Sequence, residues 1–340
     1  MYERPDQKEW GLHGEVSEDG RYLVISIWQG TEVHNRLFYR DLHQGGMVEL
    51  INQLEAAYSF VGNDGPVFYF RTDLNAPRGR LVAIDTTRPE KANWRTLIPE
   101  GSAVLESARL VNDQFIAVLN LDAHHEIYRF ALDGTRLGEI RLPALGTVSS
   151  NGETEVNGAR TDQELFFGFT SFLFPLTVYR YDFARDACEP LFAPPVPFDP
   201  AGYETRQVFV NSKDGAKIPL FLTHKKGLRW DGQNPTFLYG YGGFNISMMP
   251  AFATHRLAWL EMGGVYAQAV LRGGGEYGEE WHQAGSLANK QNVFDDFIAC
   301  AEWLIAEKVT STPKLAINGG SNGGLLVGAC LCQRPDLFGA

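Results

Sequence analysis

The first 190 residues consist of short β-type segments that recur at a regular spacing. A strand ending in aspartate recurs at Asp41, Asp85, Asp133 and Asp182, at intervals of 44, 48 and 49 residues. Units of roughly 40–50 residues with about four strands each are typical of β-propeller blades. The sequence therefore predicts four propeller blades here, with two unrelated β-sandwiches as the alternative. The expected strands are 21–27, 36–41, 67–73, 80–85, 115–121, 126–133, 164–169 and 177–182, and each unit is expected to end in a further short apolar strand, MVELI, WRTLI, RLGEIRL or CEPLF.

A proline-rich segment, LFAPPVPFDPAGY at 191–203, follows these strands. Each proline fixes φ and removes a backbone donor, so neither a helix nor a central strand can continue through the segment. We therefore predict a domain boundary here, with a partial β-propeller domain at 1–198 and a second domain at 199–340.

The second domain has a different pattern of elements. A hairpin is expected at 204–224, followed by buried apolar strands at 235–240, 265–271 and 314–318. Helical periodicity lies between these strands, at 252–262 and 293–308. Strands that alternate with helices predict a mostly parallel sheet with crossover helices, which is an α/β domain.

The segment GGSNG at 319–323 lies between the last of these strands and an apolar helix expected at 322–333. A G-x-S-x-G motif in this context predicts a nucleophile elbow, in which small residues allow close backbone packing. Ser321 would be the nucleophile, and the backbone N–H of Asn322 would point toward a developing oxyanion. The alternative is a structural turn in which the serine caps the helix.

Two other glycine clusters end buried strands. FLYGYGGFN (237–245) lies where α/β-hydrolases supply a second oxyanion donor, and a tyrosine hydroxyl can serve there as well as a backbone amide, although core packing would also explain the aromatic residues. LRGGGEYG (271–278) contains G-x-G-x-x-G, with Asp295 and Asp296 downstream, which leaves a dinucleotide site as an alternative. The residues behind it lack an apolar period, so we expect a loop that lines a pocket and no helix directly after the glycines.

Three long runs, FLYGYGGFNIS, LRGGGEYGEEWHQAGSLANKQNVFDDF and INGGSNGGLLVGACLCQRPDLFG, resemble the prolyl oligopeptidases. The first half is similar as well, in EVSEDGRYLVISI and FTSFLFP. The resemblance implies an α/β-hydrolase domain capped by a seven-bladed propeller, in a serine peptidase that cleaves short peptides on the carboxyl side of proline. It implies that Ser321 is the nucleophile, that Tyr241 and Asn322 form the oxyanion hole and that Phe244 lines the substrate pocket. No cofactor or metal is expected, the partners are short proline-containing peptides, and the full-length protein is expected to be a monomer.

The sequence departs from the family at the catalytic triad. The order Ser, Asp, His of α/β-hydrolases places both partners after Ser321, where Asp336 is the sole acid and no histidine follows. His255 and His282 precede the serine without a carboxylate spaced to orient them, so we interpret them as structural. We therefore expect an internal fragment with about four of seven blades, inactive by itself. The alternatives are a non-catalytic propeller binding module, a dinucleotide-dependent oxidoreductase, and a dipeptidyl- or acylaminoacyl-peptidase.

Composition excludes several other classes. The net charge of −11 argues against a nucleic-acid partner or an anionic membrane surface, because phosphate binding needs concentrated Lys and Arg. We expect no membrane-spanning segment, and with no secretory signal in view we expect a cytoplasmic protein. The four cysteines lack a disulfide or metal-binding pattern and are expected to be buried free thiols.

Overall fold

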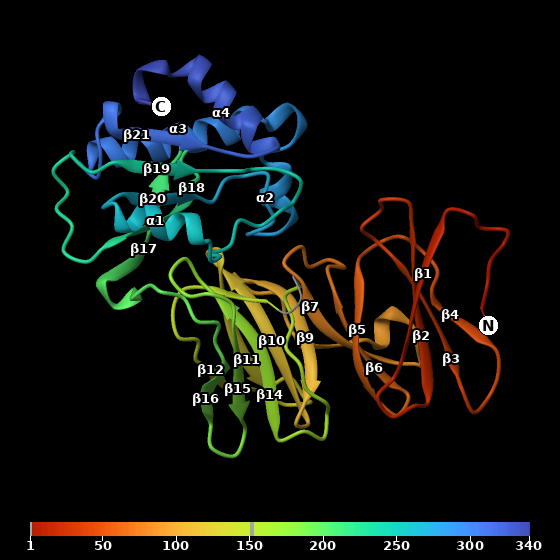
Figure 1. The fold of residues 1–340 in the computed structure, drawn as a ribbon. Helices are drawn as coiled ribbons and strands as arrows, with labels where there is room; N and C mark the ends of the chain where they lie inside the picture. The colour runs from red at the N-terminus through yellow and green to blue at the C-terminus, as the bar shows by residue number, and fades with distance from the viewer. Residues whose placement is uncertain (1, 150–152) are drawn as a thin grey trace.

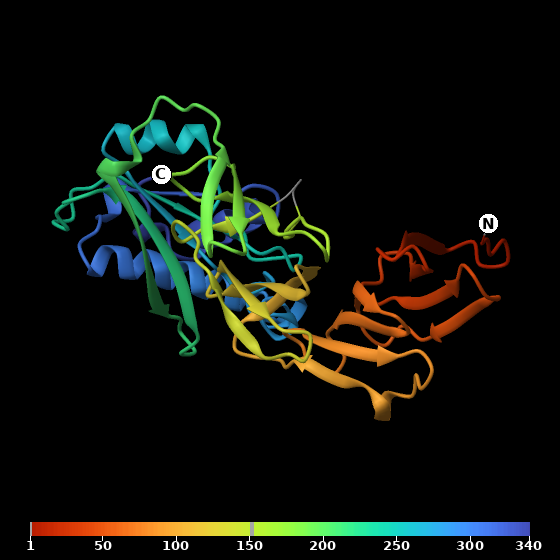
Figure 2. The ribbon, with the colours of Figure 1, turned by 90° about the horizontal axis from the view of Figure 1, so that it is seen from below.

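The computed structural model describes residues 2–149 and 153–340. Within these residues, the strands form four sheets of four strands and one sheet of five (Figure 1). The four-stranded sheets follow one another along the chain, and the sheet nearest the N-terminus lies farthest from the C-terminal domain (Figures 1 and 2).

Each of the first four sheets is formed from consecutive strands in antiparallel order. This arrangement confirms the predicted repeat of four-stranded units. The strands are β1 (Trp10–Val16), β2 (Tyr22–Gln29), β3 (Arg36–Asp41) and β4 (Met47–Ile51); β5 (Tyr58–Asp64), β6 (Val67–Thr72), β7 (Arg80–Asp85) and β8 (Arg95–Ile98); β9 (Val104–Val111), β10 (Gln114–Leu121), β11 (His124–Phe130) and β12 (Arg136–Ile140); and β13 (Thr147–Val148), β14 (Glu164–Thr170), β15 (Thr177–Asp182) and β16 (Ala187–Phe192).

Large apolar side chains join each sheet to the next. The rings of Tyr22 in β2 and Phe68 in β6 meet edge to face with centroids 4.8 Å apart, and Tyr69 and Phe115 repeat this contact between the second and third sheets. Val118 of β10 and Phe167 of β14 share the core between the third and fourth sheets. The inward side chains of the repeat thus bury the faces of neighbouring sheets, as propeller blades require.

The five-stranded sheet has the order β17-β18-β20-β19-β21. β17 and β18 form an antiparallel hairpin, β18 pairs antiparallel with β20, and β19 pairs parallel with both β20 and β21. This mixed sheet confirms the α/β prediction. Its strands are β17 (Tyr203–Asn211), β18 (Lys217–Lys225), β19 (Thr236–Tyr239), β20 (Val265–Ala269) and β21 (Leu315–Asn318).

Helices cover both faces of this sheet (Figure 2). Helix α1 (Thr254–Glu261) packs Leu257 against Tyr266 on one face, whereas α3 (Gln291–Ala306) and α4 (Asn322–Gln333) pack Phe297 and Leu326 on the other. One expectation was wrong, because a five-residue helix, α2 (Glu279–Gln283), begins directly behind the glycine cluster 271–278. A helix this short shows no apolar period, while two glutamates in its first turn favour its N-terminus.

The N-terminal sheets and the C-terminal domain share an apolar core, in which Phe172 lies against Phe221 and Tyr266, and they also meet through polar contacts. The hydroxyl of Tyr277 donates to Oδ1 of Asp122 at 2.7 Å, and the hydroxyl of Thr147 donates to the carbonyl of Pro250 at 2.6 Å. The segment that links the domains runs from the end of β16 at Phe192 to the start of β17 at Tyr203. The glycine-rich turn after β20 therefore reaches the propeller sheets directly.

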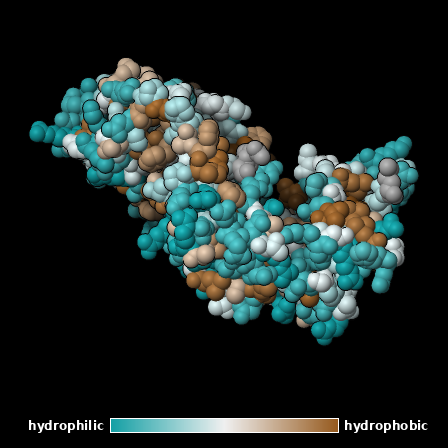
Figure 3. All heavy atoms as spheres, turned by 60° about the horizontal axis from the view of Figure 1, so that its bottom comes forward, coloured by the Kyte–Doolittle hydropathy of each residue, from teal (hydrophilic) through white to brown (hydrophobic). Residues whose placement is uncertain are grey.

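The surface is hydrophilic over most of the face in Figure 3, with apolar groups scattered in small clusters. All four cysteines are free thiols, but Cys332 is exposed, which corrects the expectation that all are buried. Cys330 and Cys332 lie two positions apart on α4, so they point to different faces of the helix. Among the described residues, no helix combines the length and apolarity needed to span a bilayer.

Candidate active site

Ser321 lies in the turn between β21 and α4, and its residue is exposed to solvent. Its backbone has φ 53° and ψ −118°, a conformation that residues with a Cβ atom adopt only at a cost. The turn is held by a 2.7 Å hydrogen bond from Gly323 N–H to the carbonyl of Gly320 and by one of 2.8 Å from Gly324 N–H to the carbonyl of Ser321. The structure therefore places the predicted nucleophile on a strained, solvent-facing turn.

The glycines beside Ser321 allow backbone to pack against backbone. A Cβ atom on Gly319 would lie 2.8 Å from the Cα atom of Gly323, and one on Gly323 would lie 2.8 Å from the carbonyl oxygen of Gly240. Both separations are shorter than any ordinary contact, so only glycine fits at these positions. The turn is consequently pressed against the end of β19, where the YGYGG segment begins.

Asn322 connects the turn to that segment. Its side-chain amide donates to the carbonyl of Tyr241 at 2.6 Å and to the carbonyl of Gly242 at 3.1 Å. The structure thus brings together Ser321, Asn322 and the backbone of Tyr241, although they are 80 residues apart in sequence. Tyr241 is half-buried. Because Asn322 opens α4, its backbone N–H is one of the unpaired donors at the start of that helix.

Phe244 lies at the tip of the same segment and is 73% exposed, with φ 57°. Its ring therefore faces solvent, where it can contact a ligand. Asn245, which follows it, donates its N–H to the carbonyl of Gly273 at 3.1 Å. The segments after β19 and β20 are thereby joined at the edge of the sheet that carries Ser321.

The two histidines considered at the sequence level lie elsewhere. Nδ1 of His282 is 2.9 Å from the carbonyl oxygen of Gly273 and 3.2 Å from the backbone nitrogen of Asn245, so this nitrogen is engaged with the loop backbone. His255 is exposed on α1, which covers the opposite face of the sheet from α4. Neither arrangement orients an imidazole toward Ser321.

Lys290, which sequence reasoning did not single out, also contacts the YGYGG segment. Its ammonium group donates to the carbonyl of Gly242 at 2.6 Å and to Oδ1 of Asn322 at 3.2 Å. Burial lowers the pKa of this lysine. Nothing in its local sequence, LANKQN, distinguishes it from a surface lysine ahead of a helix.

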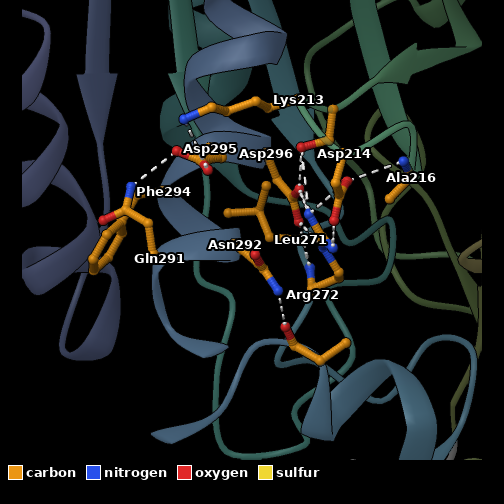
Figure 4. A network of polar contacts seen from close by, with 12 residues as sticks. Lys213, Asp214, Ala216, Leu271, Arg272, Gln291, Asn292, Phe294, Asp295 and Asp296 are labelled. Carbon is orange, nitrogen blue, oxygen red and sulfur yellow. Dashed lines mark hydrogen bonds and ion pairs between the residues drawn. The ribbon is translucent and has the colours of Figure 1, made fainter. Parts of the chain in front are cut away.

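A second group missed from the sequence lies beneath the turn after β20 (Figure 4). Arg272 is bonded to Asp296 through Nε at 2.9 Å and Nη2 at 2.5 Å, and to Asp214 at 2.5 Å. Ser212 donates to Asp296, which is fully buried. Burial lowers the pKa of Arg272, but the hydrogen bonds that it donates to Asp296 and Asp214 outweigh this effect and raise the pKa overall.

This network bears on the dinucleotide alternative. Asp296 is occupied by Arg272 and Ser212 in the protein interior, and Asp295 accepts a 2.9 Å hydrogen bond from Gln291 on its own helix. Neither carboxylate is directed toward a ribose site beside the glycines. The contacts therefore favour a structural role for Asp296 and do not support the dinucleotide alternative.

Glu276 is a buried acid in the turn after β20, and only 1% of it is exposed. Its Oε1 accepts a 2.6 Å hydrogen bond from the N–H of Met248. Burial, with a smaller contribution from the charge of Glu106, raises the pKa of Glu276 to about 7. As for metals, residues 2–149 and 153–340 contain no cluster of three or more His, Cys, Asp or Glu side chains placed to bind an ion.

Comparison with known proteins gives matches along most of the chain. Residues 1–194 match the family model for the prolyl oligopeptidase N-terminal β-propeller domain, and residues 250–340 match the model for the prolyl oligopeptidase family. A prolyl endopeptidase of Elizabethkingia miricola is 41% identical over 96% of this chain and 45% of its own length. Prolyl oligopeptidase A of Amanita bisporigera is 35% identical over the whole chain and 46% of its own length.

Solved structures agree with these matches. A structure from a study of two prolyl endopeptidases and their inter-domain dynamics superposes with a TM-score of 0.86 at 40% identity, covering 99% of this chain and 49% of that one. The apo form of prolyl oligopeptidase B from Galerina marginata gives a TM-score of 0.86 at 34% identity, covering 97% and 48%. The chain spans about half the length of the curated relatives it matches. With a propeller-domain model that matches more than half of its residues, the chain belongs to the prolyl oligopeptidase family.

Proposed function

We propose that this chain carries the nucleophile-bearing part of a serine peptidase that cleaves short peptides on the carboxyl side of proline. The observation that carries the proposal is the exposed, strained Ser321, bound through Asn322 to the segment that bears Tyr241. The names of the relatives, prolyl endopeptidase and prolyl oligopeptidase, support the substrate class.

In the proposed reaction, Oγ of Ser321 attacks the carbonyl carbon of the proline residue while a general base takes the hydroxyl proton. The carbonyl oxygen becomes an oxyanion that accepts hydrogen bonds from the backbone N–H of Asn322 and the hydroxyl of Tyr241. The C–N bond then breaks as the protonated base returns the proton to the leaving amine, and water hydrolyses the acyl-enzyme by the same steps. Phe244 would contact the substrate from its exposed position.

The general base belongs to another part of the protein in this proposal. Among the described residues, no histidine forms a hydrogen bond with Ser321, and the sequence has no histidine after it. A serine without its base retains only the contribution of the oxyanion hole and of binding. The 340 residues alone are therefore expected to give no measurable turnover of a peptide substrate.

The proposal is tested with the complete protein as its gene encodes it. We expect it to hydrolyse a blocked Gly-Pro p-nitroanilide and to be labelled at Ser321 by an organophosphonate. Ser321→Ala should lower kcat by about 10⁶-fold and abolish labelling. Ser311→Ala, at the other end of β21, is the matched control and should leave turnover unchanged.

Three outcomes would count against this proposal. Turnover that survives Ser321→Ala would exclude this nucleophile, and an unlabelled, inactive complete protein would favour the non-catalytic binding module. Preference for a peptide with a free N-terminus, or for an N-acylated residue in place of proline, would indicate a dipeptidyl- or acylaminoacyl-peptidase. Ser321-dependent turnover by the 340-residue chain would contradict the assignment of the base to another part of the protein.

A further inference from the structure

Three segments of the C-terminal domain meet at the side chains of Lys290 and Asn322. Lys290 immediately precedes α3, Asn322 opens α4, and the carbonyls of Tyr241 and Gly242 belong to the segment after β19. The amide of Asn322 is used at both ends, because Oδ1 accepts from Lys290 at 3.2 Å while Nδ2 donates to Tyr241 and Gly242. Gly242 receives the second bond of Lys290 as well, at 2.6 Å.

These contacts add to the close packing of a buried glycine-rich segment, in which a Cβ atom on Gly242 would lie 2.3 Å from the side chain of Val293. Gly240, Gly242 and Gly243 have more backbone freedom than any other residue type, and Gly242 adopts φ 62°. A Cβ atom on Gly243 would lie 2.6 Å from Nδ2 of Asn322, so the segment packs directly on the amide that binds it. Asn322 and Lys290 therefore bind the two peptide carbonyls that directly follow the Cα atom of Tyr241.

The charge of Lys290 is not used in an ion pair. Among the described carboxylates, none lies within ion-pair distance of its ammonium group, which instead faces a carbonyl and an amide oxygen. Burying an unpaired cation costs free energy, and burial lowers the pKa of this lysine accordingly. A half-buried lysine without an ion-pair partner contributes little to the stability of the fold. A role in the candidate site therefore explains its position better than a structural role does.

We propose that Lys290 is a positioning residue, which acts with the side chain of Asn322 to hold the Tyr241 hydroxyl where an oxyanion forms. We call the side chains of Lys290 and Asn322 the clamp. The inference rests on the proposed function, because it assigns the clamp to the oxyanion hole of that reaction. It also separates two roles of Asn322: the backbone N–H donates to the oxyanion, and the side chain fixes the second donor.

A double-mutant cycle in the complete protein tests this proposal. Tyr241→Phe should lower kcat by about 10²–10³-fold, as loss of one oxyanion donor does. Lys290→Met, which keeps an unbranched side chain one atom shorter and removes its donors, should lower kcat by about 10–100-fold with little change in KM. Because Lys290 acts through Tyr241, adding Lys290→Met to Tyr241→Phe should cost less than about threefold more.

Further variants separate the clamp from general damage. Asn322→Ala keeps the backbone N–H and should behave like Lys290→Met, whereas Lys217→Met, an exposed lysine in β18, should leave kcat unchanged. Hydrogen exchange at residues 240–245 supplies a readout that is independent of turnover. Both clamp variants should accelerate exchange there by about tenfold or more while the rest of the domain keeps its protection.

The outcomes distinguish this inference from the proposed function. If wild-type turnover depends on Ser321 but Lys290→Met matches Lys217→Met, or if the losses from Lys290→Met and Tyr241→Phe multiply, the inference is wrong and the peptidase assignment stands. If the complete protein has no Ser321-dependent turnover, the proposed function fails and the positioning role fails with it. If exchange at 240–245 is unchanged in a folded Lys290→Met variant, the clamp itself is refuted.

Discussion

Two glycine-rich turns follow the strands on either side of β19 in the sheet, one after β20 and one after β21. They have similar sequences but opposite structural roles. The turn after β21 exposes Ser321 on backbone with φ 53°, whereas the turn after β20 buries Arg272 and Glu276. In the first, a reactive hydroxyl is presented to solvent at the cost of strain. In the second, charged groups are withdrawn into a hydrogen-bonded interior that also contacts the propeller sheets through Tyr277. Strain and solvent exposure distinguish the turn of the candidate active site, whereas the turn after β20 is distinguished by burial and by the ion pairs of Arg272 with Asp296 and Asp214.

The largest change in the free energy of unfolding should come from removing the buried ion pairs of Arg272 in the turn after β20. Arg272→Met would leave Asp296 buried without its cationic partner, because the carboxylate keeps only the hydrogen bonds from Ser212 and from the backbone N–H of residue 272. Removing one member of a buried ion pair costs about 3–5 kcal/mol, so the free energy of unfolding should fall by about that amount. Urea denaturation monitored by tryptophan fluorescence measures it.

The matched control is an arginine on the surface. Arg206 pairs with Glu204 at 3.0 Å, but its side chain is 54% exposed, so Arg206→Met should change the free energy of unfolding by less than about 1 kcal/mol. Equal effects of the two substitutions would mean that the turn after β20 is not stabilised by its buried charges.

The next effect concerns Glu276 and pH. Its pKa in the folded protein is about 7, against an ordinary value of 4.5, so the folded state binds more protons than the unfolded state between these values. The stabilisation is fully present below pH 4.5 and is lost as pH rises through 7, amounting to about 3 kcal/mol. Glu276→Gln cannot ionise, so its melting temperature should decline less between pH 5 and 8 than that of the wild type. Parallel curves for the two proteins would contradict the assignment of this slope to Glu276.

The sequence predicted elements where the pattern is local. Helix α4 was expected at 322–333 and has those bounds, because an apolar run begins at the serine turn and Pro335 follows it. The first strand of each propeller sheet was missed. β1 is largely exposed, β13 has only two residues, β5 is interrupted at Gly62, and β9 (VLESARLV) has polar residues at three of its middle positions, so apolar alternation is weak in all four. These strands form because their neighbours provide partners for their backbone.

In the candidate site, too, the features set by local sequence were predictable and those set by distant partners were not. The elbow at Ser321 was predictable because the glycines, the strand and the helix lie within 20 residues. Its supports were not, since Arg272 pairs with Asp214 over 58 positions and Lys290 reaches Gly242 over 48. A single sequence contains no local pattern that assigns a partner at such distances.

The smallest expected change in the free energy of unfolding comes from relieving the backbone strain at Ser321. Ser321→Gly removes the Cβ atom that disfavours φ 53°, which should relieve about 1–3 kcal/mol of strain, less the entropy that glycine gains in the unfolded chain, about 0.4–1 kcal/mol. A net gain of about 1 kcal/mol in the free energy of unfolding is expected. Ser321→Ala keeps the Cβ atom and should change it by less than about 0.5 kcal/mol.

In the turn after β20, adding a Cβ atom should lower the free energy of unfolding, the opposite of the gain expected when Ser321→Gly removes one. Gly278 has φ 85°, and a Cβ atom there would lie 2.9 Å from the carbonyl oxygen of Pro77 in the propeller region, so Gly278→Ala should lower the free energy of unfolding by about 1–3 kcal/mol. Urea denaturation of the three variants beside the wild type measures both signs in one series. If Ser321→Gly and Ser321→Ala have the same stability, the turn after β21 stores no strain, and exposure alone would distinguish it from the turn after β20. If Ser321→Gly is the more stable, this protein holds its serine in a costly backbone conformation, which is the trade of stability for activity expected of a nucleophile.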